Sequence, residues 1–161
     1  MRQFYIGIDN GVSGSIGILG GPLGPRFFRT PVFKDRSYTK DEKHISRVDV
    51  KALRDIVQGF PADTLVLLER PMVNPQRFAA SMSAMRALEA TLIVLEACDY
   101  FIRYVDSKEW QSVQLPKIVG ADELKAASLK LGGELYPELK PKFKSDADSL
   151  LMARWAWDSK L

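Results

Sequence analysis

The sequence predicts a single α/β domain over residues 1–161, built on a mixed sheet of five strands with helices on both faces. Its 161 residues match one typical domain of about 100–200 residues, and 46% of them are hydrophobic. The first third alternates short apolar runs with glycine-rich turns, which is typical of an antiparallel meander. The remainder alternates helical and β-prone segments, and a meander followed by this alternation gives a mixed sheet.

The composition narrows the classes of protein that fit. A net charge of +3 and an isoelectric point near 9.0 are compatible with a nucleic-acid partner. The lone Cys98 has no partner for a disulfide within the chain. We expect no membrane span, because no run of about 18 apolar residues is evident. The N-terminus shows no signal peptide, so the expected location is the cytoplasm.

The opening meander is expected to contain three strands. Phe4 to Asp9 alternates apolar side chains, and Asn10-Gly11 after it is a strong turn signal. Ser15 to Leu19 would pair with this first strand. Glycines and prolines over 20–25 mark the next turn, and Arg26 to Val32 would form the third strand.

The middle of the chain predicts a loop, a helix, a strand and a long helix. Phe33 to Arg47 is polar and charged, which favours a mobile loop. A helix follows over about 48–57, with Asp49 at its start. Thr64 to Glu69 is a continuous apolar run, typical of a strand buried on both faces. Arg77 to Cys98 has the strongest helical spacing, and its Met and Leu stripe is expected to be mostly core, with part available as a dimer seam.

The last third predicts one more strand and three helical segments. They are a strand over 100–105, a short turn over 107–110 with Ser107 as N-cap, a helix over 121–131 ended by Gly132-Gly133, and a final helix over about 145–157. A proline- and lysine-rich connection over 135–144 would separate the last two helices.

Four acids stand where a purely structural role is costly. Asp9 and Glu69 end apolar strands, and Asp146 and Asp148 open the last helix. An unpaired carboxylate at the edge of a core costs several kcal/mol unless a cation or donors compensate it. If the two strands are neighbours, these acids converge and call for a hard divalent cation. Paired Mg²⁺ ions roughly 3.5–4 Å apart activate water for phosphodiester hydrolysis.

Each acid also has an ordinary structural interpretation. Asp9 before Asn10-Gly11 fits an Asx turn. Glu69 beside Arg70 fits a salt bridge at a strand end. Ser145 followed three residues later by Asp148 resembles a capping box. The functional interpretation depends on the combination of acids and on their order along the chain.

In that order, the sequence resembles the RuvC-type Holliday junction resolvases of the ribonuclease H-like superfamily. The resemblance extends over nearly the whole chain in five segments, of which no single one is specific. They are Tyr5-Ile6-Gly7-Ile8-Asp9-Asn10-Gly11 with Ser13-Gly14-Ser15-Ile16-Gly17, Leu67-Leu68-Glu69-Arg70-Pro71, Asn74 to Ala90, Val119-Gly120-Ala121-Asp122-Glu123-Leu124-Lys125, and Lys144-Ser145-Asp146-Ala147-Asp148-Ser149-Leu150-Leu151-Met152-Ala153.

The resemblance implies a ribonuclease H-like fold, a homodimer, and cleavage of four-way DNA junctions by paired nicks with two Mg²⁺ or Mn²⁺ ions per site. Asp9, Glu69 and Asp148 match the family's acidic ligands by position. The fourth family acid lies three residues before the last one, where this chain has Ser145, so Asp146 matches only with a shift. Lys144 matches a basic residue beside the metals and would stabilise the attacked phosphate.

Further residues are expected to contact DNA. Most are cations, and Met72 stands where many family members carry an aromatic residue, so it would act as an apolar wedge. The predicted set is Arg70, Met72, Arg77, Arg86, Lys117, Lys125, Lys140 and Lys142. Phosphate contacts of this kind position DNA without reading its sequence. A solvated basic loop is the structural alternative for the lysines.

The sequence therefore predicts a metal-dependent endonuclease that resolves four-way DNA junctions. Two alternatives stay within the fold: an RNA-processing nuclease of the YqgF-like type, and a non-catalytic junction-binding protein. The first turn also resembles the phosphate loop of sugar kinases and actin-like ATPases, but those enclose a nucleotide between two domains and this chain holds one. Two matched cuts need two active sites, which again predicts a homodimer.

Overall fold

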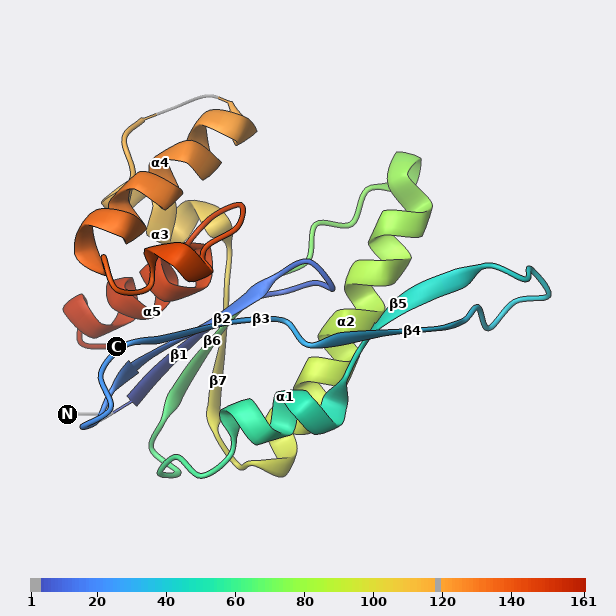
Figure 1. The fold of residues 1–161 in the computed structure, drawn as a ribbon, viewed down its shortest axis with the longest axis horizontal. Helices are drawn as coiled ribbons and strands as arrows, with labels where there is room; N and C mark the ends of the chain where they lie inside the picture. Colours follow the sequence, from blue (N-terminus) through green and yellow to red (C-terminus); the bar gives the residue numbers. More distant parts are fainter. Residues whose placement is uncertain (1–3, 118–119) are drawn as a thin grey trace.

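The computed structural model of the chain describes residues 4–117 and 120–161, and Figure 1 shows its fold. The strands are β1 (Phe4–Asp9), β2 (Ser15–Gly20), β3 (Arg26–Arg29), β4 (Val32–Arg36), β5 (His44–Val48), β6 (Leu65–Glu69) and β7 (Phe101–Val105). The helices are α1 (Val50–Val57), α2 (Phe78–Ala97), α3 (Ser107–Gln114), α4 (Ala121–Leu135) and α5 (Asp148–Asp158), with 3₁₀ turns η1 (Pro75–Arg77) and η2 (Lys140–Lys142). Val119 of the fourth resembling segment lies outside the described residues.

Five strands form one mixed sheet in the order β3-β2-β1-β6-β7. The meander β1-β2-β3 is antiparallel, whereas β6 and β7 run parallel to β1. The predicted mixed five-stranded sheet is therefore confirmed. Ile8 of β1 lies opposite Leu68 of β6, so the residues that follow them, Asp9 and Glu69, emerge at the same edge.

Helices cover both faces of this sheet, as predicted (Figure 1). Tyr5 and Leu67 face the core under α3, α4 and α5, which is centred on Leu150 and Trp110. Their neighbours along the strands face the opposite core under α1 and α2. Because both faces are buried, β6 is apolar without alternation.

Helix α5 lies directly on β1 and β2, because two glycines leave room for its backbone. A Cβ on Gly7 would collide with the Ser149 carbonyl, and a Cβ on Gly17 would collide with the Leu150 backbone. The Ser15 hydroxyl donates to the Ser149 hydroxyl at 2.8 Å and fixes the contact. This close approach brings the start of α5 to the end of β1.

The predicted loop over residues 33–47 is wrong, because this segment forms the hairpin β4–β5. The strand predicted over 26–32 breaks at Thr30-Pro31, and β4 continues away from the main sheet. Polar pairs hold the hairpin: Arg47 bonds Asp35 at 2.6 Å, and Lys34 donates to Ser46 at 2.8 Å. A two-stranded ribbon with charged side chains lacks the apolar alternation that identifies a strand in sequence.

Three helix boundaries also differ from the sequence prediction. Helix α3 is capped by Asp106 rather than Ser107 and continues to Gln114. Helix α4 passes through Gly132-Gly133 to Leu135, and Gly132 packs where a Cβ would meet the Ala147 side chain. Helix α5 begins at Asp148 rather than near Ser145.

Helix α2 is less buried than its sequence predicted. Leu95 is in the core, but Phe78 is 71% exposed, and Met82 and Met85 are more than 40% exposed. Among the described residues, the segment Pro75–Ala97 is long and apolar enough to cross a membrane, judged by length and composition alone. A core helix of a soluble protein passes the same test, so the expectation of no membrane span stays a prediction.

Candidate active site

Four carboxylates gather at one edge of the main sheet. Asp9 ends β1, Glu69 ends the parallel neighbour β6, and Asp146 and Asp148 stand at the start of α5. The charges of Asp146 and Asp148 act on both Asp9 and Glu69. The predicted set of acids is thus brought together from three segments far apart in sequence.

Asp9 has charged neighbours of both signs. Burial raises its pKa to about 7, and the nearby carboxylates of Asp146 and Asp148 act in the same direction. The positive charges of Lys125 and Arg29 oppose this shift. The β1–β2 turn is closed by the Gly14 N–H on the Gly11 carbonyl at 3.1 Å, so Asp9 does not close it.

Glu69 is equally out of place as a structural residue. Burial raises its pKa to about 8, and Asp9 is the first of the four acids that add to the shift. Its Oε2 atom is buried and has no hydrogen-bond partner among the described residues. The alternative of a Glu69–Arg70 salt bridge is not observed, because Arg70 pairs with Asp106 at 3.2 Å.

Asp148 is held by a buried serine from the neighbouring helix. The Ser128 hydroxyl of α4 donates to Asp148 Oδ1 and accepts from the Ala147 N–H at 3.0 Å. Burial raises the pKa of Asp148 to about 6, against the lowering effect of the Ser128 hydrogen bond. Ser128 was missed in the sequence because nothing in the pattern of α4 marks it as a neighbour of residue 148.

Asp146 precedes α5 and has two local partners. Its Oδ2 accepts from the Ser145 hydroxyl at 2.8 Å, and its Oδ1 accepts from the Asp148 N–H at 3.3 Å. Residues two apart on a helix point to opposite sides. Asp146 precedes the helix and only Asp148 belongs to it, so this rule does not place the two side chains on opposite sides. The charges of both acids act on the pKa of Asp9.

The donor set fits a hard divalent cation. Every donor is a carboxylate oxygen, the ligand that Mg²⁺ and Mn²⁺ prefer, and Glu69 Oε2 is a buried acceptor without a donor. In residues 4–117 and 120–161 as they stand, no three His, Cys, Asp or Glu side chains are close enough to hold one ion together. The hydroxyls of Ser128 and Ser145 donate to Asp148 Oδ1 and Asp146 Oδ2, so a cation bound to those oxygens would replace the two hydrogen bonds.

The metal-free protein is expected to lose stability between about pH 4 and pH 8. The folded pKa values of Asp148, Asp9 and Glu69, at about 6, 7 and 8, exceed the ordinary carboxyl value near 4. Their contribution to stability is complete below about pH 4 and disappears as pH rises through 6 to 8. Melting temperature in chelator should fall across this window, and Mg²⁺ should restore it most at the alkaline end.

Asp9→Asn is the matched variant for this measurement, since it removes one titrating acid without changing its size. Its melting curve should depend less on pH and on Mg²⁺ than that of the wild type. A melting temperature that is constant from about pH 4 to pH 8 in chelator would show that the acids are not coupled as the structure indicates.

The predicted basic residues are not all near the acids. Lys125 of α4 acts on both Asp9 and Asp148, whereas Lys144 is exposed and has no hydrogen bond or ion pair with the acids in the described structure. Arg29 at the end of β3 also acts on Asp9 and donates to the Ser13 carbonyl at 2.9 Å. Arg29 could be found only with the sheet order known, since its strand lies two positions from β1.

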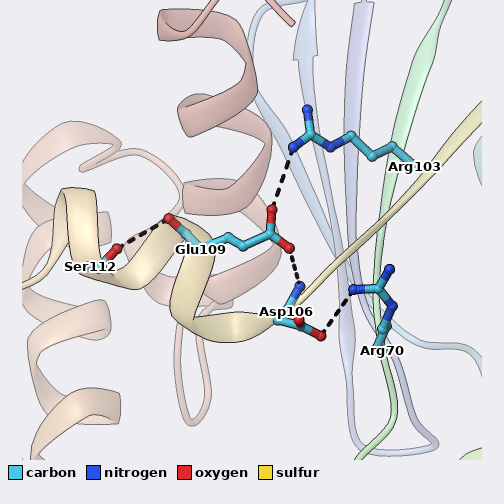
Figure 2. A network of polar contacts seen from close by, with 5 residues as sticks. All are labelled: Arg70, Arg103, Asp106, Glu109 and Ser112. Atoms are coloured by element: carbon cyan, nitrogen blue, oxygen red, sulfur yellow. Dashed lines mark hydrogen bonds and ion pairs between the residues drawn. The ribbon is translucent and has the colours of Figure 1, made fainter.

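Arg70 lies in a polar network beside Glu69 (Figure 2). Its guanidinium pairs with Asp106, whose N–H donates to Glu109 Oε1 at 2.9 Å in the capping box of α3. The other Glu109 oxygen pairs with Arg103 at 3.4 Å. Ion pairs this exposed contribute about 0–1 kcal/mol, so a DNA phosphate could compete with Asp106 for Arg70.

The other residues predicted to contact DNA are distributed over the surface. Met72 is 85% exposed, and Arg86 is half-buried on α2. The remaining side chains are exposed: Arg77, Lys117, Lys140 and Lys142. Their roles, like the ligand roles of the four acids, stay predictions.

Solved structures identify the fold. Two structures of RuvC from Thermus thermophilus are similar to this chain, one described as a RuvC structure and one as RuvC in complex with a Holliday junction substrate. Their TM-scores are 0.61 and 0.58, each at 15% identity, and the matches cover 98% and 99% of this chain and 96% of each RuvC chain. No family model matches the sequence, and no curated protein is significantly similar to it. The chain therefore has the RuvC-like ribonuclease H fold.

Proposed function

We propose that this protein is a divalent-metal-dependent endonuclease that resolves four-way DNA junctions by paired nicks. One observation carries the proposal: in a RuvC-like fold, four carboxylates from β1, β6 and the start of α5 gather at one edge, where their charges raise the pKa values of Asp9 and Glu69. A cluster of carboxylates lowers stability unless a cation neutralises it. A role in folding therefore does not explain why these acids lie together.

Each acid would have a defined part in the reaction. Asp9, Glu69, Asp148 and Asp146 would hold Mg²⁺ or Mn²⁺, two ions per site. The ions, when bound, would lower the pKa of the attacking water and neutralise charge on the leaving oxygen. Lys125 and Arg29 supply positive charge next to Asp9, where the attacked phosphate would approach. Ser128 fixes the orientation of the Asp148 carboxylate.

A homodimer supplies the second cut. The chain holds one acidic cluster, and a four-way junction needs two matched nicks. The exposed apolar residues Phe78, Met82, Met85 and Ile93 recur along one side of α2, and an apolar stripe of this kind on a helix is typical of a contact surface. We propose that α2 forms part of the dimer contact.

A cleavage assay on labelled substrates tests the proposal. A four-way DNA junction should be cut into two nicked duplexes only with Mg²⁺ or Mn²⁺, and a linear duplex of the same sequence should stay intact. Faster cutting of an RNA substrate would support the RNA-processing alternative. Junction binding without cutting at any metal concentration would support the non-catalytic alternative.

DNA binding should depend on the lysines of η2. Replacing Lys140 and Lys142 with alanine should lower junction affinity and reduce the log–log salt slope by about one unit for each phosphate that a lysine no longer neutralises. Both side chains are exposed, so the variant should fold normally. Titrating a fluorescent junction at several salt concentrations measures both quantities.

Lys160→Ala is the control for these lysines, because this exposed lysine lies beyond the end of α5 opposite to the acids. It should change neither affinity nor slope. A wild-type slope for the Lys140/Lys142 variant would place the DNA path elsewhere on the protein.

A further inference from the structure

The hairpin β4–β5 has no part in the main sheet or in the acidic site. It forms a two-stranded sheet of its own and extends past α2 on the side away from α3, α4 and α5 (Figure 1). Of the remaining elements, β5 packs against α2. An element that adds little to the core and keeps its strands paired through polar contacts is a candidate for binding.

The hairpin is basic. Residues 32–48 contain five Lys and Arg side chains against three Asp and Glu side chains. The cations are Lys34, Arg36, Lys40, Lys43 and Arg47, and the anions are Asp35, Asp41 and Glu42. Lys40 and Lys43 are exposed near its tip. Such a charge balance favours a polyanionic partner.

Between the hairpin and α2 lies a pocket of about 140 Å³. Its walls include Tyr38 and Arg47 from the hairpin, Ser83 and Arg86 from α2, and Val12 from the β1–β2 turn. The pocket therefore combines hydroxyl and guanidinium donors with an aromatic wall, which suits a phosphate group.

Two guanidinium groups meet at one aromatic ring in this pocket. Arg47 lies 5.4 Å and Arg86 lies 5.9 Å from the centre of the Tyr38 ring. Arg47 is already paired with Asp35, but the Nε atom of Arg86 is buried and has no hydrogen-bond partner among the described residues. A buried donor without an acceptor costs stability, so Arg86 is the group that lacks its ligand.

The pocket is a neighbour of the acidic cluster. Val12 in its wall follows Asp9 by three residues, and the Asn10 side chain donates to the Ala84 carbonyl of α2 at 3.1 Å. The β1–β2 turn thus separates the carboxylates from Arg86. A DNA strand with its scissile phosphate at Asp9 would place a flanking phosphate near this pocket.

We propose that the pocket between the hairpin and α2 binds a phosphate of the DNA strand that flanks the cut site, with Arg86 as its main donor and the basic hairpin as a second DNA contact. The proposal rests on the proposed function, since it takes DNA as the substrate. It assigns to β4–β5 a role in holding one arm of the junction outside the acidic site.

Arg86→Gln tests the pocket through binding in chelator, where no cutting occurs. Affinity for a fluorescent four-way junction should fall about tenfold or more, and the salt slope should decrease by about one unit. Benzoylphenylalanine in place of Lys40 should crosslink to a labelled junction strand, whereas the same residue in place of Lys160 should not.

Arg26→Gln is the matched control. Arg26 also lies over an aromatic ring, that of Phe60 at 5.0 Å, and its Nε is also buried without a partner among the described residues, but it begins β3 at the edge opposite to the acids. The control should bind like the wild type. An equal loss for both arginine variants would show a general structural effect and overturn the proposal.

Where Arg86→Gln does not fold, the double variant Lys40→Ala, Lys43→Ala gives the same test on exposed side chains. A wild-type slope for this variant would overturn the hairpin contact.

A wild type that binds but never cuts, with Arg86→Gln binding more weakly, would support the pocket and refute the nuclease. Normal cutting by the wild type with unchanged binding by Arg86→Gln would refute the pocket alone, and a wild type that neither binds nor cuts would refute both.

Discussion

Asp9→Asn is expected to abolish cleavage of a four-way junction while leaving junction binding largely unchanged. Asp9 is the half-buried acid on which the charges of Asp146, Asp148, Lys125 and Arg29 all act. The substitution keeps the size of the side chain and removes its charge. Losing a residue that only supports a metal ligand costs about 10–100-fold in activity, so losing the ligand itself should cost more than about 100-fold.

The measurement is a single-turnover cleavage rate with Mg²⁺, beside a binding titration in chelator. Asp55→Asn is the control, because Asp55 is an exposed acid of α1 whose side chain accepts from Gln58, and it is not among the charges that shift the pKa values of Asp9, Glu69 and Asp148. It should cut at the wild-type rate. If Asp9→Asn also cuts at that rate, Asp9 does not hold the metal and the assignment of the site fails.

The sheet and its acids could be predicted because short sequence signals define them. The apolar runs of β1 and β6 end in a carboxylate, and their parallel pairing follows from a meander that is continued by crossing helices. Glu69 therefore reaches Asp9 through strand order, without any side-chain detail. The strand ends carry the information because a buried strand leaves few choices of register.

The supporting residues could not be predicted in this way. Arg29, Asp106 and Ser128 reach the acids from β3, the end of β7 and the middle of α4. Each is an ordinary surface or helix residue in sequence, and only the packing of α4 and α5 against the sheet makes Ser128 a partner of Asp148. Tertiary contacts of this kind leave no periodic signal along the chain.

The hairpin was missed for the opposite reason. Its strands are stabilised by cross-strand polar pairs and by Arg47 against the aromatic rings of Phe33 and Tyr38, so the pattern of its sequence is that of a solvated loop. A strand is recognised in sequence by the apolar residues that it buries, and β4 is mostly exposed. A basic segment without apolar alternation can still be an ordered strand pair when arginines and aromatics face each other.

Asp148→Ala is expected to eliminate cleavage, whereas Asp146→Ala should cause a smaller loss that Mn²⁺ partly restores. Asp148 is the first residue of α5 and is half-buried, and Ser128 and the close contact of α5 with Gly7 and Gly17 hold it beside Asp9. It also matches the last acid of the resembling family without a shift. Its removal should therefore cost more than about 100-fold in rate.

Asp146 has two possible roles, as a helix cap and as a metal ligand, and they can be measured separately. Its Oδ1 accepts from the Asp148 N–H and so supports the start of α5, while its charge acts on Asp9 and Glu69. Loss of a helix cap costs about 0.5–2 kcal/mol, which lowers the melting temperature and leaves the rate at low temperature intact. Loss of a ligand lowers the rate at every temperature.

Melting temperature and cleavage rate for Asp146→Ala, Asp146→Asn and Asp148→Ala separate these roles. The Asn variant keeps an oxygen that can accept from the Asp148 N–H, so it should melt like the wild type and still cut more slowly, because it lacks the charge. Ser128→Ala should slow cutting about 10–100-fold by releasing the Asp148 carboxylate. An inactive and fully stable Asp146→Ala beside an active Asp148→Ala would reverse the assignment. In that case the acid before α5, rather than its first residue, would be the ligand.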